Sequence, residues 1–228
     1  MKRIFHSGDI ADSFTLDGDY FHYIKNVIRG REGDVIGVLT ASEFAECRIA
    51  EIGRKGALME VDSRRPAQRH DYSLKVYQCL LKREYMDFAV EKYAELGATE
   101  IIPVVSERSL NELKDKTKQR FTDIAVKAVL QSENEQMPLI GDSIDIKDVD
   151  ADMDSNVVFY ERHEGAGIIK PAKSMSIIIG PEGGFTDEEF QTLVAKGFAA
   201  SKPVSQILKA ETAAVVFAGY VRILQETL

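Results

Sequence analysis

The segment IIIGPEGGFTDEE, residues 177–189, contains the change of backbone type that determines the fold of this chain. Its three isoleucines are typical of a buried strand, and Gly180 and Pro181 then interrupt the run. Thr186 and Glu189 have the spacing of a Thr-x-x-Glu capping box, which predicts a helix that begins directly after Thr186. Residues 181–185, PEGGF, are therefore a loop between a strand and a helix.

The residues of this loop fit a ligand site at the carboxyl edge of a parallel sheet, where open α/β sheets bind ligands. Gly183 and Gly184 permit positive φ and close approach to the backbone, and Pro181 stiffens the turn. Glu182 opposes phosphate, and both the Walker Lys-Ser/Thr and the G-x-G-x-x-G spacing are missing. The carboxylate suits a ligand with a positive centre, such as an ammonium or a sulfonium. A strand-to-helix turn without any ligand is the alternative, and the turn alone slightly favours it.

Strands and helices alternate around this loop from residue 74 onward, which predicts a doubly wound parallel α/β sheet. The expected strands are residues 74–81, 99–106, 156–161 and 174–180. The expected helices are residues 84–97, 116–131 and 187–197, and Gly97 and Gly197 provide stop signals for two of them. Strand patterns at residues 34–40, 44–52 and 57–62 and a short helical pattern at 20–29 predict a small β-barrel or sandwich before it. We expect a domain boundary at residue 70, with the polar residues 63–70 as linker.

Composition narrows the class of protein. At 228 residues and 44% hydrophobic the chain can bury a core, and its net charge of −8 argues against a generic nucleic-acid coat. Residues 1–70 contain 11 basic and 11 acidic residues, so the whole deficit lies in the rest of the chain. Cys47 and Cys79 match no zinc or redox spacing, and we expect two reduced thiols, no metal and no membrane span. With no signal sequence, we expect a soluble cytoplasmic protein.

Four segments together resemble the ribosomal RNA small subunit methyltransferase E family, the 16S rRNA (uracil-N3)-methyltransferases of the SPOUT superfamily. GPEGGFTDEE (residues 180–189) resembles its most specific motif, and ILKAETAA (207–214) resembles a second, R-I-L-R-x-E-T-A. EKYAELGATEIIPVVSERS (91–109) and FHYIKNVIRGREGD (21–34) resemble two further patterns. The likeness runs nearly from end to end.

This resemblance implies a PUA-like RNA-binding β-barrel at residues 1–70 and a SPOUT methyltransferase domain with a C-terminal trefoil knot at residues 71–228. It also implies a homodimer through the last helix, S-adenosyl-L-methionine as cofactor, and 16S rRNA of the small ribosomal subunit as substrate. The expected cofactor-binding residues are Tyr160, Glu161, Ile179, Gly180, Pro181, Glu182, Gly183, Gly184, Ile207 and Leu208.

Methylation of uracil N3 requires loss of the N3 proton, and a cation near the carbonyls stabilises the developing anion. We expect Lys209 to be that cation and Glu211 and Thr212 to orient the loop or relay the proton, with helix capping as the alternative. The expected RNA contacts are Arg3, His22, Lys25, Arg29, Arg31, Lys82 and Arg83. For these residues the alternatives are core packing for His22 and ordinary surface charge for the rest.

The chain departs from the family patterns at arginine positions. Gln206, Lys209 and Asn134 stand where the family has arginine. Lys209 keeps the charge but not the planar fork, so we expect an active enzyme. An RNA-binding assembly protein that has lost activity, or a small-molecule methyltransferase, is the alternative.

Overall fold

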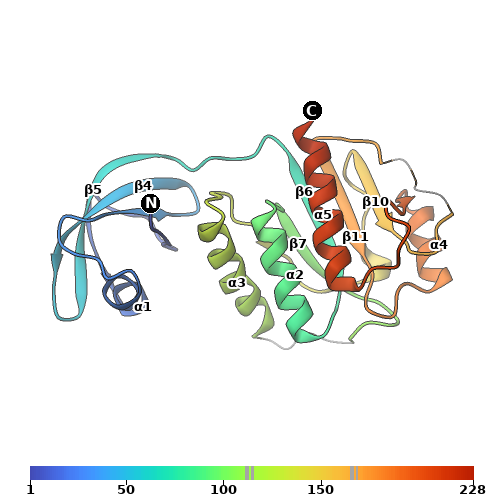
Figure 1. The fold of residues 1–228 in the computed structure, drawn as a ribbon, viewed down its shortest axis with the longest axis horizontal. Helices are drawn as coiled ribbons and strands as arrows, with labels where there is room; N and C mark the ends of the chain where they lie inside the picture. The colour runs from blue at the N-terminus through green and yellow to red at the C-terminus, as the bar shows by residue number, and fades with distance from the viewer. Residues whose placement is uncertain (111–112, 114–115, 165–166, 168) are drawn as a thin grey trace. The chain divides into compact units, whose positions relative to one another are not determined.

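The computed structural model describes residues 1–110, 113, 116–164, 167 and 169–228, and they form two compact units. Unit 1 consists of Met1–Arg69 together with Glu133–Gln136, and unit 2 of His70–Ser132 and Met137–Leu228. Each unit has its own sheet, and the colours of Figure 1 separate the blue strands of unit 1 from the later strands of unit 2.

The sheet of unit 1 has five strands in the order β1, β3, β4, β5, β2. The strands are β1 (Arg3–Phe5), β2 (Ser13–Asp17), β3 (Val35–Leu39), β4 (Glu43–Ile52) and β5 (Gly56–Pro66). β1 is parallel to β3, and the other neighbours are antiparallel. The three predicted strands are confirmed. The predicted linker is wrong in its first part, because residues 63–66 pair with β4 as the end of β5.

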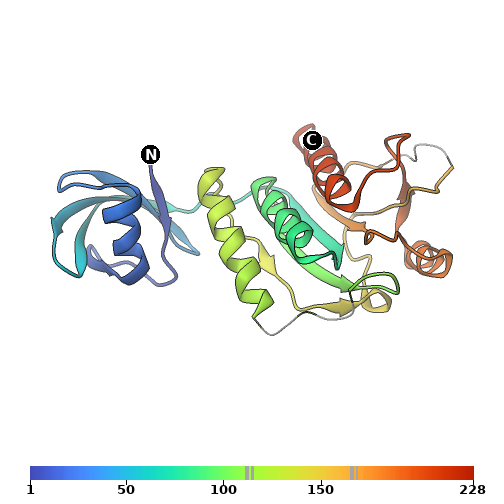
Figure 2. The same cartoon turned by 60° about the horizontal axis from the view of Figure 1, so that its bottom comes forward.

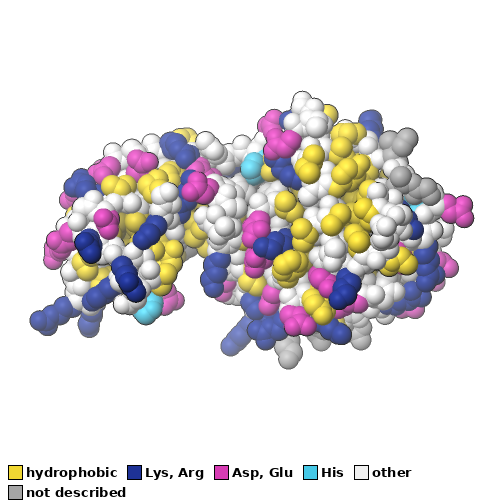
Figure 3. Space-filling view, viewed as in Figure 1, with side chains coloured by type: hydrophobic (Ala, Val, Ile, Leu, Met, Phe, Trp, Pro, Cys, Tyr) yellow, Lys and Arg dark blue, Asp and Glu magenta, His cyan; other side chains and the backbone are white. Residues whose placement is uncertain are grey.

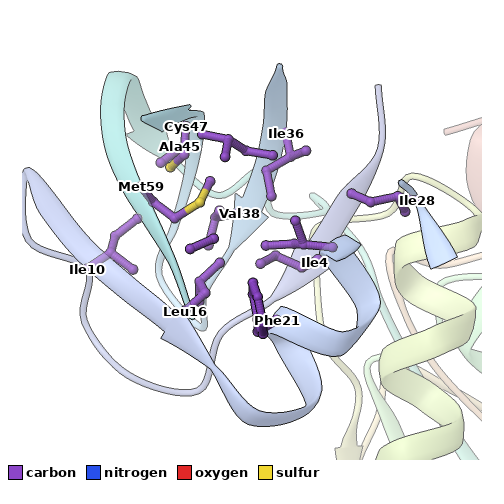
Figure 4. Packing of buried hydrophobic residues seen from close by; sticks show 13 residues of the cluster. Ile4, Ile10, Leu16, Phe21, Ile28, Ile36, Val38, Ala45, Cys47 and Met59 are labelled. Atoms are coloured by element: carbon purple, nitrogen blue, oxygen red, sulfur yellow. The ribbon is translucent and has the colours of Figure 1, made fainter. Parts of the chain in front are cut away.

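The helical segment of unit 1 changes its winding halfway along. α1 (Gly18–His22) continues directly into a π-helix (Tyr23–Val27), in which Ile28 N donates to Tyr23 O at 3.0 Å. The segment ends at Arg29, which has φ 52°. Phe21 points from it into the core that contains Leu16, Val38 and Met59 (Figure 4), and Ile24 belongs to the same buried cluster. The helical prediction for residues 20–29 is confirmed in type, with a start two residues earlier.

The sheet of unit 2 is parallel throughout, as predicted, in the order β12, β10, β11, β6, β7, β8, with β9 also paired to β7. Its predicted strands are β6 (Ser73–Cys79), β7 (Glu100–Val105), β10 (Ser155–Phe159) and β11 (Ser174–Ile179). Three short strands escaped prediction, β8 (Leu139–Ile140), β9 (Ile144–Asp145) and β12 (Ala199–Ser201).

Helices cover both faces of this sheet. α2 (Arg83–Glu95) packs between α3 (Thr117–Gln131) and α5 (Ala210–Glu226) on one face, as both ribbon views show (Figures 1 and 2). Tyr93 of α2 donates there to the buried side chain of Gln78 in β6. Tyr77 of β6 points to the opposite face, where it clusters with Phe185 and with Leu193 of α4 (Asp187–Ala195). A short 3₁₀ helix, Ile146–Asp148, adds to that second layer.

The predicted helix stops and thiols are confirmed. Gly97 and Gly197 follow α2 and α4 with φ of 80° and 105°, a conformation that costs other residues more. Cys47 and Cys79 are free and buried. No helix within the described residues is long and apolar enough to cross a membrane.

Candidate functional site

A pocket lies in unit 2 at the carboxyl ends of β10, β11 and β12 and beside the start of α5. Strand ends, two loops and one helix face supply its walls. Its lining is Phe159, Tyr160, Glu161, Ile179, Gly180, Pro181, Glu182, Gly183, Gly184, Ser201, Lys202, Val204, Gln206, Ile207, Leu208, Ala210, Ala213 and Phe217. All ten residues predicted for the cofactor are among them.

One wall is the glycine loop, residues 180–186, between β11 and α4. Gly184 has φ 67°, and its N–H donates to Pro181 O at 2.9 Å, which closes a tight turn. The predicted capping box is confirmed, since Thr186 Oγ1 accepts from Glu189 N at 3.2 Å and Glu189 Oε2 accepts from Thr186 N at 2.9 Å. The loop shape therefore follows from its own glycine and from the cap of the next helix.

The glycine loop has little room for side chains. A Cβ atom on Gly184 would lie 2.7 Å from Glu161 Oε1, and one on Gly180 would lie 3.1 Å from the Phe185 ring. A side chain at either position would have to displace a neighbour, and Gly184 is also in a left-handed conformation that favours glycine.

The Glu182 carboxylate has a hydrogen-bond partner within the protein. Its Oε1 accepts from the backbone N–H of Lys82 at 3.1 Å, at the N-cap of α2. This bond ties the end of β11 to the connection that follows β6. The interpretation of Glu182 as a group reserved for a cationic ligand is thus incomplete, because the carboxylate also has a partner within the protein.

Tyr160 and Glu161 continue β10 into the pocket. The Tyr160 hydroxyl donates to Asp187 Oδ1 at 2.9 Å, and its ring stacks on Phe190 with centroids 4.0 Å apart. Burial and the bond to Asp187 raise the pKa of Tyr160, so its hydroxyl remains protonated at neutral pH. Tyr160 is a fixed wall rather than an acid or base.

The opposite wall is the pre-helix loop, residues 202–208, between β12 and α5. Its residues make no hydrogen bond with any part of the chain that the structure describes. Ile207 is 75% exposed although it lines the pocket. The apolar floor below is well ordered by contrast, since Phe159 and Phe217 stack with centroids 4.0 Å apart.

The three predicted catalytic residues surround the start of α5 without lining the pocket. Lys209 is the N-cap residue and is exposed, Glu211 lies half-buried in the first turn, and Thr212 is exposed. None of the three side chains has a partner among the described residues. They are therefore open to a substrate above the pocket.

Several lining residues were not predicted from the sequence. Phe159 ends a strand that had been recognised, so its position at the edge was open to inference. Ser201 ends β12 and Lys202 follows it, and this strand has only three residues, which is too short a pattern to recognise. Ala210, Ala213 and Phe217 belong to the apolar face of α5 and look like ordinary core positions. Val204 and Gln206 complete the set.

The predicted RNA contacts in unit 1 fall into two groups. His22, Lys25, Arg29 and Arg31 are all exposed and follow one another along the helical segment and its turn. Lys25 Nζ lies 5.4 Å from the centre of the Phe21 ring, and Asn26 Nδ2 is 3.0 Å from His22 Nδ1.

Arg3 differs from that group. Its side chain is 12% exposed, lies over the Phe44 ring and pairs with Glu133 and Glu135. In unit 2, Lys82 and Arg83 are exposed at the start of α2, where Arg83 approaches Asp87 at 3.9 Å. Arg3 is thus engaged within the protein, whereas the other predicted contacts remain accessible.

Residues 68–222 match the family model of the RNA methyltransferase domain, and residues 16–62 match that of the RNA methyltransferase PUA domain. The first match covers more than half of the chain, which therefore belongs to the RNA methyltransferase family. The PUA-like assignment of the first strands is confirmed by the second match.

Curated proteins similar to this chain include several that are named ribosomal RNA small subunit methyltransferase E. The protein of Rickettsia conorii is 28% identical, with 98% of this chain and 96% of the relative covered. That of Bacillus subtilis is 29% identical, with 89% and 87% covered. The family resemblance inferred from the motifs is thereby confirmed.

The fold agrees with that of solved structures. A ribosomal RNA small subunit methyltransferase E from Neisseria gonorrhoeae, crystallised with S-adenosyl methionine, superposes with a TM-score of 0.87 at 24% identity, with 98% of each chain covered. The α/β architecture with its parallel sheet is confirmed in this way. The trefoil knot stays a prediction.

Proposed function

We propose that this chain transfers a methyl group from S-adenosyl-L-methionine to N3 of a uracil in small-subunit ribosomal RNA. One observation supports it most. All ten residues expected to bind the cofactor line a single pocket, at the sheet edge where α/β proteins bind ligands, in a member of the RNA methyltransferase family.

The residues of the pocket fit this cofactor. Phe159, Ala213 and Phe217 offer an apolar surface for an adenine ring, and Glu161 and Glu182 offer carboxylates to hydroxyls and to a positive centre. Gly180 and Gly184 line the pocket with backbone alone. When bound, the cofactor supplies an electrophilic methyl group.

The side chains at the start of α5 handle the acceptor. Uracil N3 becomes nucleophilic as it loses its proton, and negative charge then builds on the adjacent carbonyl oxygens. Lys209, free of partners in the described chain, is the cation that offsets this charge. Glu211 and Thr212 orient the turn or relay the proton.

RNA binding is assigned to the exposed basic run of unit 1, with Lys82 and Arg83 as further contacts in unit 2. The match to an RNA methyltransferase PUA domain supports an RNA substrate over a small molecule. Replacing Arg29 and Arg31 by Glu should weaken binding to small-subunit particles and lower the salt slope by about one unit per lost contact. Arg54→Glu, an exposed turn variant of the same unit, is the control. An unchanged slope would place the RNA footprint elsewhere.

A homodimer through α5 is supported by an apolar stripe on that helix. Val216, Tyr220 and Ile223 are 38%, 38% and 66% exposed and lie on one helical face. Phe88 of α2 is 40% exposed, and Figure 3 shows hydrophobic side chains gathered over α5 and α2. Light scattering should give twice the chain mass of 25.4 kDa. Ile223→Asp should give the monomer, and a wild type that is monomeric at all concentrations contradicts the proposal.

The decisive experiment is methyl transfer from labelled S-adenosyl-L-methionine to small-subunit particles that lack the modification. Nucleoside mass spectrometry should identify 3-methyluridine, which chromatography separates from its isomers. Label on another atom of the base or on the ribose would refute the N3 assignment. A wild type that binds the cofactor normally but methylates no RNA would favour the inactive RNA-binding alternative.

A further inference from the structure

Arg108 lies outside the pocket but contacts its glycine loop. The residue follows β7 in the turn that contains Ser106 and Ser109, and its side chain extends across to the connection between β11 and α4. We infer that Arg108 is a positioning residue, which holds the glycine loop in the shape that accepts the cofactor. The inference rests on the proposed function of the pocket.

The contact is made by one nitrogen and two carbonyl groups. Arg108 Nη1 donates to Gly183 O at 3.2 Å and to Phe185 O at 3.3 Å. These carbonyls precede and follow Gly184, the left-handed residue of the loop. The guanidinium thus spans the point at which the chain reverses.

The two peptide groups held by Arg108 are also bonded on their other sides. In a trans peptide the C=O and the N–H point in opposite directions. The N–H of the Gly183–Gly184 peptide donates to Pro181 O, and that of the Phe185–Thr186 peptide donates to Glu189 Oε2. Arg108 completes both groups, so neither peptide plane can rotate without breaking hydrogen bonds on two sides.

The stem of Arg108 contributes as well. A Cβ on Gly183 would lie 3.1 Å from Arg108 Cβ and 3.4 Å from its Cδ. Gly183 does not have a left-handed φ, so a side chain at this position would meet the arginine stem rather than backbone strain. Gly184 thus provides the left-handed turn, whereas Gly183 leaves room for the stem of Arg108.

A second bond latches the same two segments. Glu107 N, next to Arg108, donates to Glu189 Oε1 at 2.7 Å, while the other oxygen of Glu189 caps α4. Because this latch persists without the arginine, removal of Arg108 frees the loop and leaves the two segments connected. We therefore expect the loss of Arg108 to leave the glycine loop less ordered before the cofactor binds. Ordering the loop during binding then lowers the affinity for the cofactor.

The test compares Arg108→Ala and Arg108→Lys with Lys118→Ala, which removes an exposed cation from α3. Calorimetry should show S-adenosyl-L-methionine binding weakened about tenfold in the alanine variant, as expected for two lost hydrogen bonds at an exposed site. Lysine can reach one carbonyl and should restore part of the affinity. Turnover at saturating cofactor should change less than twofold, and the control should match wild type.

Hydrogen exchange on the cofactor-free protein provides a readout independent of methyl transfer. The amides of Gly184 and Thr186 should exchange faster in Arg108→Ala and stay protected in the control. Unchanged affinity, or unchanged exchange at both amides, would overturn the positioning role. If wild type itself fails to bind the cofactor, the proposed function falls, and exchange alone still decides whether Arg108 holds the loop. If Arg108→Ala does not fold, Arg108→Lys decides by the same two measurements.

Discussion

The two loops that wall the pocket are built in opposite ways. Hydrogen bonds join the glycine loop to three different parts of the chain: Lys82 N and Arg108 Nη1 donate to it, and Glu189 Oε2 accepts from it. The pre-helix loop makes no hydrogen bond to the described chain and leaves Ile207 three-quarters exposed. One wall is held in shape by the protein itself, whereas the other is exposed to solvent and has its groups free to contact a ligand.

The difference indicates how a single pocket combines selectivity with entry. The glycine loop is already ordered, so a ligand of matching shape binds to it without a cost in conformational entropy. The pre-helix loop gains contacts only when the ligand is present. Two of the three positions at which the family patterns have arginine, Gln206 and Lys209, lie in the pre-helix loop or directly after it, and the third, Asn134, lies in unit 1.

We expect Gly184→Val to disrupt the glycine loop more than the other substitutions below. A β-branched residue at φ 67° is strained, and its Cβ would overlap Glu161 Oε1. We expect S-adenosyl-L-methionine affinity to fall at least about 100-fold, the order of two unfavourable contacts of this kind, as measured by calorimetry. The matched control is Gly33→Val, also left-handed at φ 89° but with open space around it and located in unit 1. Equal affinities in a folded Gly184→Val protein would remove the glycine loop from the site.

Lys209→Ala tests the catalytic role proposed for Lys209, which directly follows the pre-helix loop. A cation that acts on the developing anion contributes mainly in the transition state, so turnover should fall about 100-fold while cofactor affinity changes little. Lys202→Ala is the contrasting variant, because Lys202 lines the pocket and Lys209 does not. It should weaken cofactor binding more than turnover. Full turnover in Lys209→Ala would transfer the cationic role to Lys82 or Arg83.

A matched pair of isoleucines gives the smallest effect on binding and the clearest contrast between the walls. Ile179 is 2% exposed and Ile207 is 75% exposed, yet both line the pocket. Ile179→Ala should cost about 2–5 kcal/mol of unfolding free energy, as buried truncations do. Ile207→Ala should leave stability unchanged and weaken cofactor binding about threefold, through apolar contact made only in the complex. A loss of stability in Ile207→Ala would show that the pre-helix loop is already packed.

The structure of the glycine loop could be predicted from the sequence better than that of the pre-helix loop. The spacing of Thr186 and Glu189 predicted the cap of α4, and the adjacent glycines predicted the turn. Both features are visible in the sequence because they depend on local backbone geometry. The bond between Glu182 and Lys82 spans 100 positions along the chain and leaves no local pattern. The role of Arg108 was hidden for the same reason.

Short strands were missed for a different reason. β1 and β12 have three residues each, fewer than a period-2 pattern needs to be recognised. Their pairing is provided by β3 and β10, whose own sequences were strong enough to be recognised. Residues 63–66 were assigned to a linker because they are polar, but the ladder with β4 satisfies their backbone regardless of side chain.

The hydrogen bond from the Lys82 amide to Glu182 couples the conformation of the glycine loop to that of the first turn of α2. Lys82 and Arg83 are also proposed RNA contacts, so a substrate that shifts this turn changes the free energy of the loop. Thermodynamic reciprocity then requires the cofactor to change RNA affinity by the same factor as RNA changes cofactor affinity. Glu182→Gln, which keeps the shape but weakens the bond to the Lys82 amide, should reduce that factor toward one when each affinity is measured with and without the other ligand.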